Sequence, residues 1–358
     1  MPVKYAPSHL NIETVNRMCN ARCPMCPIKF VPEFSIDSID EESYAGVSRL
    51  AEIMPLERFK KIINKFVEYK DDIKYINLHG CGEPLLDKTL AAKVAYARSL
   101  GFSNVGFTSN CDALTKANSM RFLEAGLTCI IPSIDGFTRE THEKIRPGTN
   151  FERIVRNVNY FIEARNELKL GCKVVIRMIK QQDNEKEWES YKSYWDQKLN
   201  PVYGDMCVDF EVHNTGGKVE NYDEKRLSTA ESSASEFLAA KRFAPLPIVD
   251  LIKSAPVSAR NFVLLESSVV EQKFLCPDLF SRLHIFASGR IGLCSADQAE
   301  YHSIGNILDF ADVADAFNSE IFETYRKKWL SRNISDQENC SKCTVVVSRY
   351  LKHKQKCN

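Results

Sequence analysis

The chain has 358 residues and a formal net charge of +1, with 44 % of its residues hydrophobic and 27 % charged. This composition indicates a soluble globular protein of one large domain or two domains of ordinary size. Because basic and acidic residues nearly balance, the charge argues against nucleic acid or an anionic membrane as the partner.

Targeting and membrane signals are missing from the sequence. The first 20 residues contain no apolar run long enough for a signal peptide, and no apolar span of about 18 residues occurs elsewhere. We therefore expect a cytoplasmic protein. In that compartment 13 cysteines are not expected to form a disulfide framework, so their number predicts metal binding or redox chemistry.

From about residue 9 to residue 216, short β-like runs alternate with helical patterns. Strands are predicted at 10–16, 73–80, 104–110, 128–135, 172–179 and 208–214. Helices are predicted at 90–101, 116–127, 151–171 and near 185–198. This alternation predicts a parallel sheet with right-handed crossovers, and six units predict an α/β fold, a partial (β/α)6 TIM-like barrel. The loops after its strands should carry the chemistry.

The second half of the chain has a different character. Residues 218–245 are polar and charged, and residues 282–294 form a hairpin signature around Ser288 and Gly289. We expect three regions: a core barrel at 1–217, a helical or polar insertion at 218–269, and a small C-terminal module at 270–358.

Three cysteines follow the first predicted strand. Cys19, Cys23 and Cys26 lie in one loop restricted by prolines, and no further Cys or His follows within fifty residues. A closed zinc or iron–sulfur site needs four ligands, so three thiolates favour a four-iron cluster with one iron left open for an outside ligand. A zinc site with a distant fourth ligand is the alternative.

With this Cx3CxxC spacing, the chain resembles the radical S-adenosylmethionine (SAM) superfamily. In that family the open iron binds the amino and carboxylate groups of SAM, and reductive cleavage of SAM gives a 5′-deoxyadenosyl radical. Further motifs match in order: "HGCGEPLL", "TSN" and "PSIDG". The resemblance implies SAM binding by Gly82, Glu83, Pro84, Ser109, Asn110, Ser133 and Asp135.

A second group of cysteines lies near the end of the chain. The pattern of Cys276, Gly289, Cys294 and then Cys340-x2-Cys343 resembles the SPASM/twitch auxiliary-cluster module. Four thiolates would close a second [4Fe–4S] cluster, with a zinc ribbon as the alternative. The full SPASM pattern continues with two more cysteines, where this chain has Arg349 and His353. The shorter twitch type is therefore expected, and Cys357 has no assigned role.

The tail is most similar to twitch-type aminocyclitol dehydrogenases, the kind that acts in butirosin biosynthesis. The resemblance implies hydrogen abstraction from a small polar substrate such as a sugar or aminocyclitol, with the auxiliary cluster taking the remaining electron. Only 18 residues precede Cys19, which disfavours a leader-binding, peptide-modifying SPASM enzyme. Flavodoxin or ferredoxin is the expected electron donor.

Two further side chains and one rival function complete the predictions. Arg177 could anchor a carboxylate or phosphate through its forked donors. Cys81, inside the Gly-Glu-Pro loop, could return a hydrogen atom to the substrate and make the enzyme an epimerase. The non-enzymatic alternative is a zinc-binding scaffold.

Overall fold

One continuous sheet organises the computed structural model, which describes residues 6–26, 51–214, 219, 221–225, 276–297, 302, 304–330, 340 and 343. The strands of this sheet are β1 (His9–Ile12), β4 (Tyr75–Asn77), β5 (Val105–Ser109), β6 (Cys129–Pro132), β7 (Lys173–Lys180), β8 (Met206–Glu211), β9 (Arg282–Ile285) and β10 (Ile291–Gly292). A second, two-stranded sheet pairs β2 (Val15–Asn16) with β3 (Glu52–Ile53).

The strand order of the large sheet is β10-β9-β1-β4-β5-β6-β7-β8. Every neighbouring pair is parallel except β9 with β10. The six strands from β1 to β8 follow one another in chain order, as right-handed strand–helix–strand units require. The predicted α/β class, with a partial barrel of parallel strands, is confirmed.

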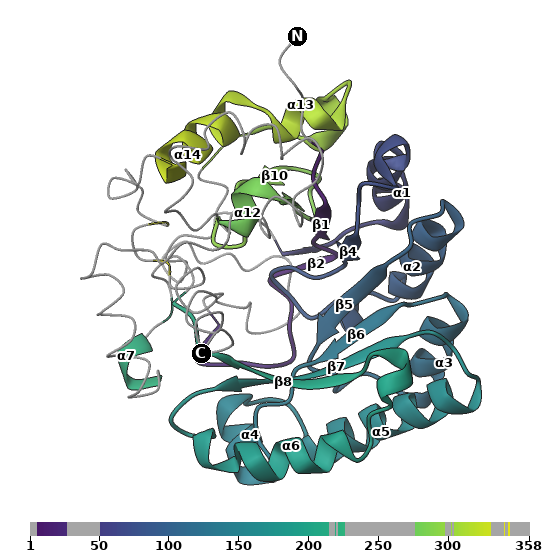
Figure 1. Cartoon of the computed structure of the whole chain (residues 1–358), viewed down its shortest axis with the longest axis vertical. Helices are drawn as coiled ribbons and strands as arrows, with labels where there is room; N and C mark the ends of the chain where they lie inside the picture. The colour runs from purple at the N-terminus through teal and green to yellow at the C-terminus, as the bar shows by residue number, and fades with distance from the viewer. Residues whose placement is uncertain are drawn as a thin grey trace.

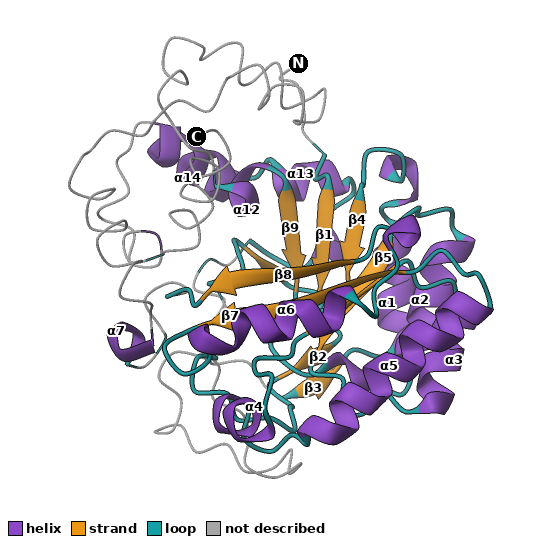
Figure 2. Cartoon of the chain, turned by 60° about the horizontal axis from the view of Figure 1, so that its bottom comes forward, coloured by secondary structure: helices purple, strands orange, loops and turns teal. Residues whose placement is uncertain are grey.

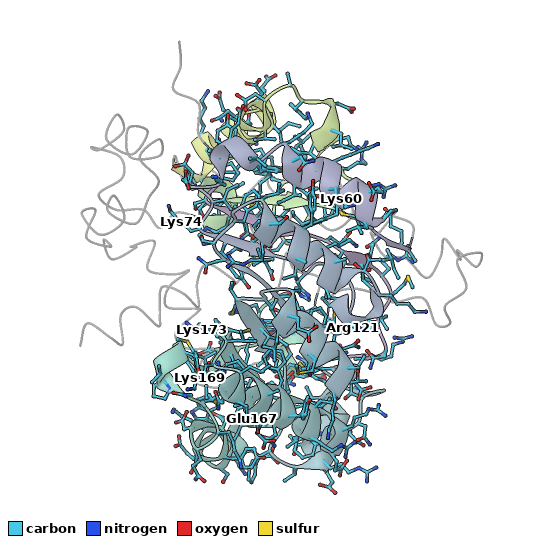
Figure 3. All side chains as sticks on the ribbon, turned by 90° about the vertical axis from the view of Figure 1, so that its right-hand side faces the viewer. Lys60, Lys74, Arg121, Glu167, Lys169 and Lys173 are labelled. Atoms are coloured by element: carbon cyan, nitrogen blue, oxygen red, sulfur yellow. The ribbon has the colours of Figure 1, made fainter. Side chains whose placement is uncertain are left out.

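Helices α1 (Leu56–Asn64), α2 (Leu90–Ser99), α3 (Lys116–Glu124), α5 (Phe151–Glu167) and α6 (Trp188–Asp196) cover the outer face of the curved sheet (Figures 1 and 2). The other α-helices of the described residues are α4 (Arg139–Ile145), α7 (Tyr222–Lys225), α12 (Pro277–Phe280), α13 (Val313–Phe317) and α14 (Glu320–Leu330). Seen from the side, the outer helix face carries charged side chains such as Arg121 and Glu167 (Figure 3). Within the described residues, no helix is long and apolar enough to cross a membrane.

Local sequence explains where several helices begin. Thr115, Thr138 and Asn150 each accept a backbone hydrogen bond at the start of α3, α4 and α5. Such caps satisfy amide groups that have no partner inside the helix. The predicted closure of the helix at 90–101 is also confirmed, because Gly101 follows α2 with a φ of 92° that glycine adopts without strain.

Alternation along the strands decides which side chains reach the inner face of the sheet. In β7, Val174, Ile176 and Met178 are buried in the hydrophobic core. Arg177 and Ile179 have the opposite parity and line a cavity on the inner face. The same rule places Leu10 and Ile12 of β1 in the core and His9 and Asn11 on the cavity side.

Two predicted elements end differently from expectation. The run predicted as one strand over 10–16 breaks into β1 and β2, because Glu13 between them accepts hydrogen bonds from the amides of Cys81 and Ala287. The helix predicted over 151–171 ends at Glu167 rather than at Gly171, and Lys169 takes the left-handed conformation with a φ of 51°.

The C-terminal hairpin forms as predicted, with Gly289 in its turn at a φ of 88°. Its strand β9 also pairs in parallel with β1, so the hairpin extends the barrel sheet. Sequence reasoning placed the hairpin in a separate module and did not predict this pairing. Most of the predicted insertion at 218–269, together with Arg349, His353 and Cys357, lies outside the described residues.

Candidate functional site

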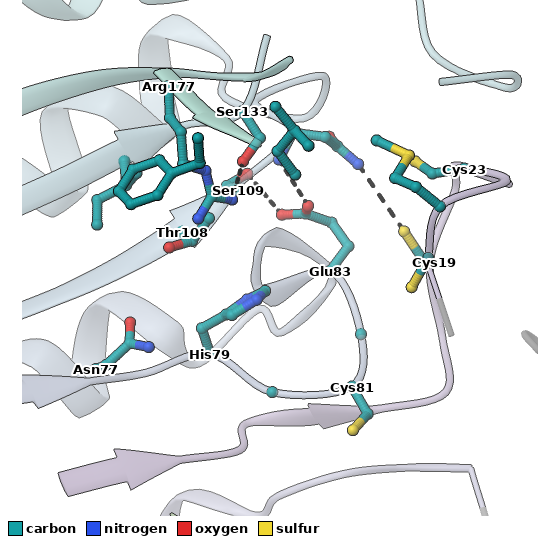
Figure 4. A pocket seen from close by; sticks show the side chains of 18 of the residues that line it. Cys19, Cys23, Asn77, His79, Cys81, Glu83, Thr108, Ser109, Ser133 and Arg177 are labelled. Carbon is teal, nitrogen blue, oxygen red and sulfur yellow. Dashed lines mark hydrogen bonds between the residues drawn. The ribbon is translucent and has the colours of Figure 1, made fainter. Parts of the chain in front are cut away.

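A cavity of about 590 Å³ opens at the carboxyl ends of the barrel strands. Its lining comes from all six strands of the partial barrel and from the cysteine loop (Figure 4). Most of the predicted site residues meet in this cavity: Cys19, Cys23, Cys26, Cys81, Gly82, Glu83, Ser109, Asn110, Ser133 and Arg177. Pro84 and Asp135 do not line it.

The cysteine loop forms one wall of the cavity. The amide of Cys26 donates to the carbonyl of Cys23 at 2.9 Å, which folds the second half of the loop into a turn. Burial, followed by the charge of Glu83, raises the pKa of the Cys19 thiol to about 12, and burial also raises the pKa of Cys23. Free thiols here are therefore protonated, and a metal must displace these protons to bind.

Glu83 lies at the centre of the cavity wall. Its Oε1 accepts from Ser109 Oγ at 2.6 Å and from the Leu85 amide at 3.0 Å, and its Oε2 accepts from the Asn110 amide at 2.9 Å. Burial raises the pKa of Glu83, although these hydrogen bonds oppose the shift. Among the described residues no cation lies within hydrogen-bond distance of Glu83, so this buried carboxylate is suited to receive a ligand amine.

The glycines of the loop around Glu83 are required by close contacts. A Cβ at Gly80 would lie 2.5 Å from Glu13 Cγ, and one at Gly82 would lie 2.7 Å from the Val15 carbonyl. The loop thus packs directly on the segment that leads from β1 to the cysteines. This contact places the Gly-Glu-Pro motif beside the cysteine loop.

Asp135 positions an arginine that sequence reasoning did not select. Both Nε and Nη2 of Arg146 lie 2.7 Å from Asp135 Oδ2, and Arg146 Nη1 lies 3.7 Å from Cys23 Sγ. Arg146 lines the cavity, whereas Asp135 is fully buried behind it. The sequence signal for this arginine is the motif "IRPG" at 145–148. Its glycine packs the segment against the cysteine loop, since Gly148 has a φ of 90° and a Cβ there would lie 2.4 Å from the Asn20 carbonyl.

Cys81 lies at the edge of the site. Its sulfur points away from Glu83 in Figure 4, although the residue is part of the cavity lining and is 6 % exposed. Its amide donates to Glu13 Oε2 at 3.0 Å, so the backbone of Cys81 has a clear structural role. A hydrogen-donor role for its thiol stays a prediction.

The auxiliary cysteines come from three separate places in the C-terminal region. Cys276 precedes α12, Cys294 follows β10, and the Cys343 amide donates to the Cys340 carbonyl at 3.2 Å. Burial raises the pKa of Cys276 and of Cys294, and Cys276 also interacts electrostatically with both Cys343 and Cys294. Thiols distant in sequence thus approach one another.

The first cysteine group suits an iron–sulfur cluster with an open iron, because Cys19, Cys23 and Cys26 all line the cavity. In a [4Fe–4S] cluster each thiolate can bind a different iron. Three thiols on one wall of an open cavity fit a cluster with one iron facing a ligand.

Comparison with known proteins agrees with this geometry. Residues 14–193 match the Radical SAM superfamily, and residues 276–344 match SPASM, an iron–sulfur cluster-binding domain. The first match spans half of the chain, so this protein belongs to the radical SAM superfamily. More particularly, it is a member that carries a SPASM domain after the barrel in its sequence. A SAM-binding [4Fe–4S] cluster and auxiliary iron–sulfur binding follow from these two families.

Individual relatives are distant. A 7,8-dihydro-6-hydroxymethylpterin dimethyltransferase of Methanocaldococcus jannaschii is 26 % identical over 76 % of this chain, which spans only about half, 49 %, of that protein. The solved structure of BtrN with AdoMet and 2-DOIA is similar with a TM-score of 0.54 at 15 % identity, over 96 % of this chain and 95 % of that one.

The structure of Streptococcus suis SuiB bound to its precursor peptide SuiA is also similar. Its TM-score is 0.61 at 12 % identity, over 96 % of this chain and 70 % of that one. At these identities the likenesses show the fold. The two family matches confirm the resemblance to the radical SAM superfamily and its SPASM branch.

Proposed function

We propose that this protein oxidises a small polar substrate of the sugar type by two electrons, starting with abstraction of a carbon-bound hydrogen. The observation that carries the proposal is the 590 Å³ cavity, which joins the cysteine loop to polar side chains at the strand ends. Pockets for small ligands measure about 300–1,000 Å³, and this one must hold SAM as well as substrate. The space left for substrate is therefore small.

The chain's own residues would bind and orient the reactants. Cys19, Cys23 and Cys26 would hold the cluster, and the Glu83 carboxylate would receive the amino group of SAM. Ser133 and Arg146 would face its carboxylate. When bound, the cluster and SAM supply the 5′-deoxyadenosyl radical. The surrounding strands exclude water from the reacting carbon.

The auxiliary cysteines support oxidation over isomerisation. After hydrogen abstraction the substrate radical must lose one electron and its hydroxyl proton, and the proton can pass to solvent. Cys276, Cys294, Cys340 and Cys343 would hold an auxiliary cluster, which would supply an acceptor for that electron. A cytoplasmic flavodoxin or ferredoxin would supply the electron that starts each turnover. The epimerase alternative depends on the thiol of Cys81, whose sulfur points away from Glu83.

Size fractionation combined with solvent labelling tests this function. The anaerobically reconstituted enzyme is incubated with SAM, dithionite and either the small-molecule or the peptide fraction of an extract from its source cells, in heavy water. We expect the small-molecule fraction to increase the amount of 5′-deoxyadenosine over that formed without any fraction. We also expect an oxidised product without solvent deuterium at the reacting carbon. Stimulation by the peptide fraction alone, or a deuterated product, contradicts the proposal.

A further inference from the structure

Arg177 differs from the other cationic side chains of the cavity. Its Nη2 donates to Ser133 Oγ at 2.6 Å, and Ser133 is its hydrogen-bond partner among the described residues. Among the described residues, its buried Nε has no hydrogen-bond partner, and no carboxylate lies within ion-pair distance of the guanidinium. The side chain faces the interior of the barrel.

The other arginines of the cavity lining each have an acid. Arg146 lies 2.7 Å from Asp135, and Arg282 lies 2.5 Å from Asp278. Arg177 has a neutral hydroxyl instead, and burial together with the nearby charge of Arg146 lowers its pKa to about 10. A cation taken from water without an opposite charge is costly, so the site is incomplete without an anion.

The acid that acts on Arg177 electrostatically is Asp135, and it is already paired with Arg146. His79 lies near Arg177 on the cavity wall, and burial followed by the charge of Arg177 lowers the pKa of His79 to about 4, so its ring is neutral. Its Nδ1 also has no hydrogen-bond partner among the described residues. Among the described residues, the acids that line the cavity are Glu83, which already accepts three hydrogen bonds, and Glu211 on β8.

The position of Arg177 decides which reactant supplies the anion. In Figure 4, Arg177 lies on the far side of the cavity from Cys19 and Cys23, with Glu83 between them. Arg146 is the arginine beside the cysteines, at 3.7 Å from Cys23 Sγ. A group held at the cluster therefore meets Arg146 first, and a molecule deeper in the barrel meets Arg177.

We propose that Arg177 receives an anionic group of the substrate, a carboxylate or a phosphate, so that the enzyme acts on an acidic or phosphorylated sugar rather than on an amine-bearing cyclitol. This inference rests on the proposed function for the reaction itself. Guanidinium groups form charge-assisted hydrogen bonds with both kinds of anion. The carboxylate of SAM is the other source of the same chemistry.

Binding to the anaerobic, SAM-saturated holoenzyme separates the two sources. The probes are inorganic phosphate, glucuronate and glucose, titrated calorimetrically into the wild type and into the variants Arg177→Gln and Arg177→Lys. We expect Arg177→Gln to weaken phosphate and glucuronate binding by about tenfold to a hundredfold, the value of one hydrogen bond to a charged group. Glucose binding should not change, and Arg177→Lys should retain part of the anion affinity.

Lys180→Gln is the matched control, because it removes a positive charge from the same strand without touching the cavity lining. Iron content and thermal unfolding of each variant show that it is folded and loaded. Equal affinity of wild type and Arg177→Gln for both anions, including no measurable binding, overturns the proposal. So does a tenfold loss of SAM affinity in Arg177→Gln without anion discrimination, which assigns Arg177 to SAM. These binding results do not depend on turnover, so they fail or succeed separately from the proposed oxidation.

Discussion

Asp135 acts on the cavity without lining it. Its Oδ2 takes two donors of Arg146, and its Oδ1 accepts from the Ile179 amide at 2.7 Å, so both oxygens are used inside the protein. The strand-end motif allowed Asp135 to be predicted as a site residue. The pairing could not be predicted, because it depends on how the loop around α4 returns to the strand ends.

His142 holds this same loop. Its Nδ1 accepts from the Asp135 amide at 3.2 Å, and its Nε2 lies 3.3 Å from Thr149 Oγ1. Burial, followed by the charge of Arg146, lowers the pKa of His142 from 6.5 to about 3. The ring is thus neutral when folded and titrates near 6.5 when unfolded. Its contribution to stability is complete above pH 6.5 and is lost as the pH falls toward 3.

We expect the free energy of unfolding to fall by up to about 1.4 kcal/mol per pH unit below pH 6.5 because of this one residue. His142→Asn cannot take up the proton, so its stability should be lower at neutral pH but should depend less on pH. Urea unfolding at a series of pH values measures both slopes. Identical slopes for the two proteins would show that another group is responsible.

The three cysteines of the first loop give a prediction about iron. Replacing Cys19, Cys23 and Cys26 together by alanine should remove about half of the iron, since one of two four-iron clusters is lost. Reductive cleavage of SAM should fall to background. Cys172→Ala is the control, because Cys172 is a buried core thiol outside the cavity. SAM cleavage that persists in the triple variant would falsify the assignment of this loop.

The sequence pattern predicted where the barrel strands lie in the chain, but not where each strand ends. Alternation of apolar residues identifies β7, and the first glycine after the pattern identifies the end of α2. The break between β1 and β2 has another origin. It depends on the two hydrogen bonds that Glu13 accepts from segments 68 and 274 residues away, which no local pattern can show.

The contact between the loop at Gly80 and Glu13 can be tested by substituting two glycines and comparing the effects. A Cβ at Gly80 would lie 2.5 Å from Glu13 Cγ, so Gly80→Ala must displace the loop that carries Glu83. We expect a loss of about 1–3 kcal/mol in unfolding free energy and weaker SAM binding. Gly171→Ala is the matched control, since nothing lies within 4 Å of the position that its Cβ would take, and its stability should be unchanged or slightly higher. Equal effects of the two changes in denaturant unfolding would contradict the contact.

At the scale of the whole molecule, the C-terminal region is joined to the barrel through its hairpin. Strand β9 pairs with β1 over four residue pairs, from His9 with Arg282 to Ile12 with Ile285. Asn11 also approaches His284 Nδ1 at 3.3 Å, so the inner face of the barrel contacts the segment between Cys276 and Cys294. The cysteine spacing predicted the module but not its attachment, because strand pairing over such a separation leaves no periodic signal.

Replacing Cys340 and Cys343 by alanine tests the auxiliary cluster. The change should remove the other half of the iron, while the first cluster, which has its own ligands, should still cleave SAM when reduced. Substrate oxidation should be lost, because the electron has no acceptor. Iron analysis and 5′-deoxyadenosine formation measure the two effects. Unchanged iron content would mean that these thiols do not bind a cluster.

The pairing of β1 with β9 also fixes an order of folding. The two strands meet across a sequence separation of 273 residues. On the ribosome β1 can pair with β4 early, but its other edge stays open until nearly the whole described chain has emerged. Contacts of this separation form slowly, and an open strand edge invites pairing with other chains. A ribosome that pauses before residue 282 would therefore leave a nascent barrel most exposed to aggregation, with its cysteine loop already made and the last two strands of its sheet, β9 and β10, still missing.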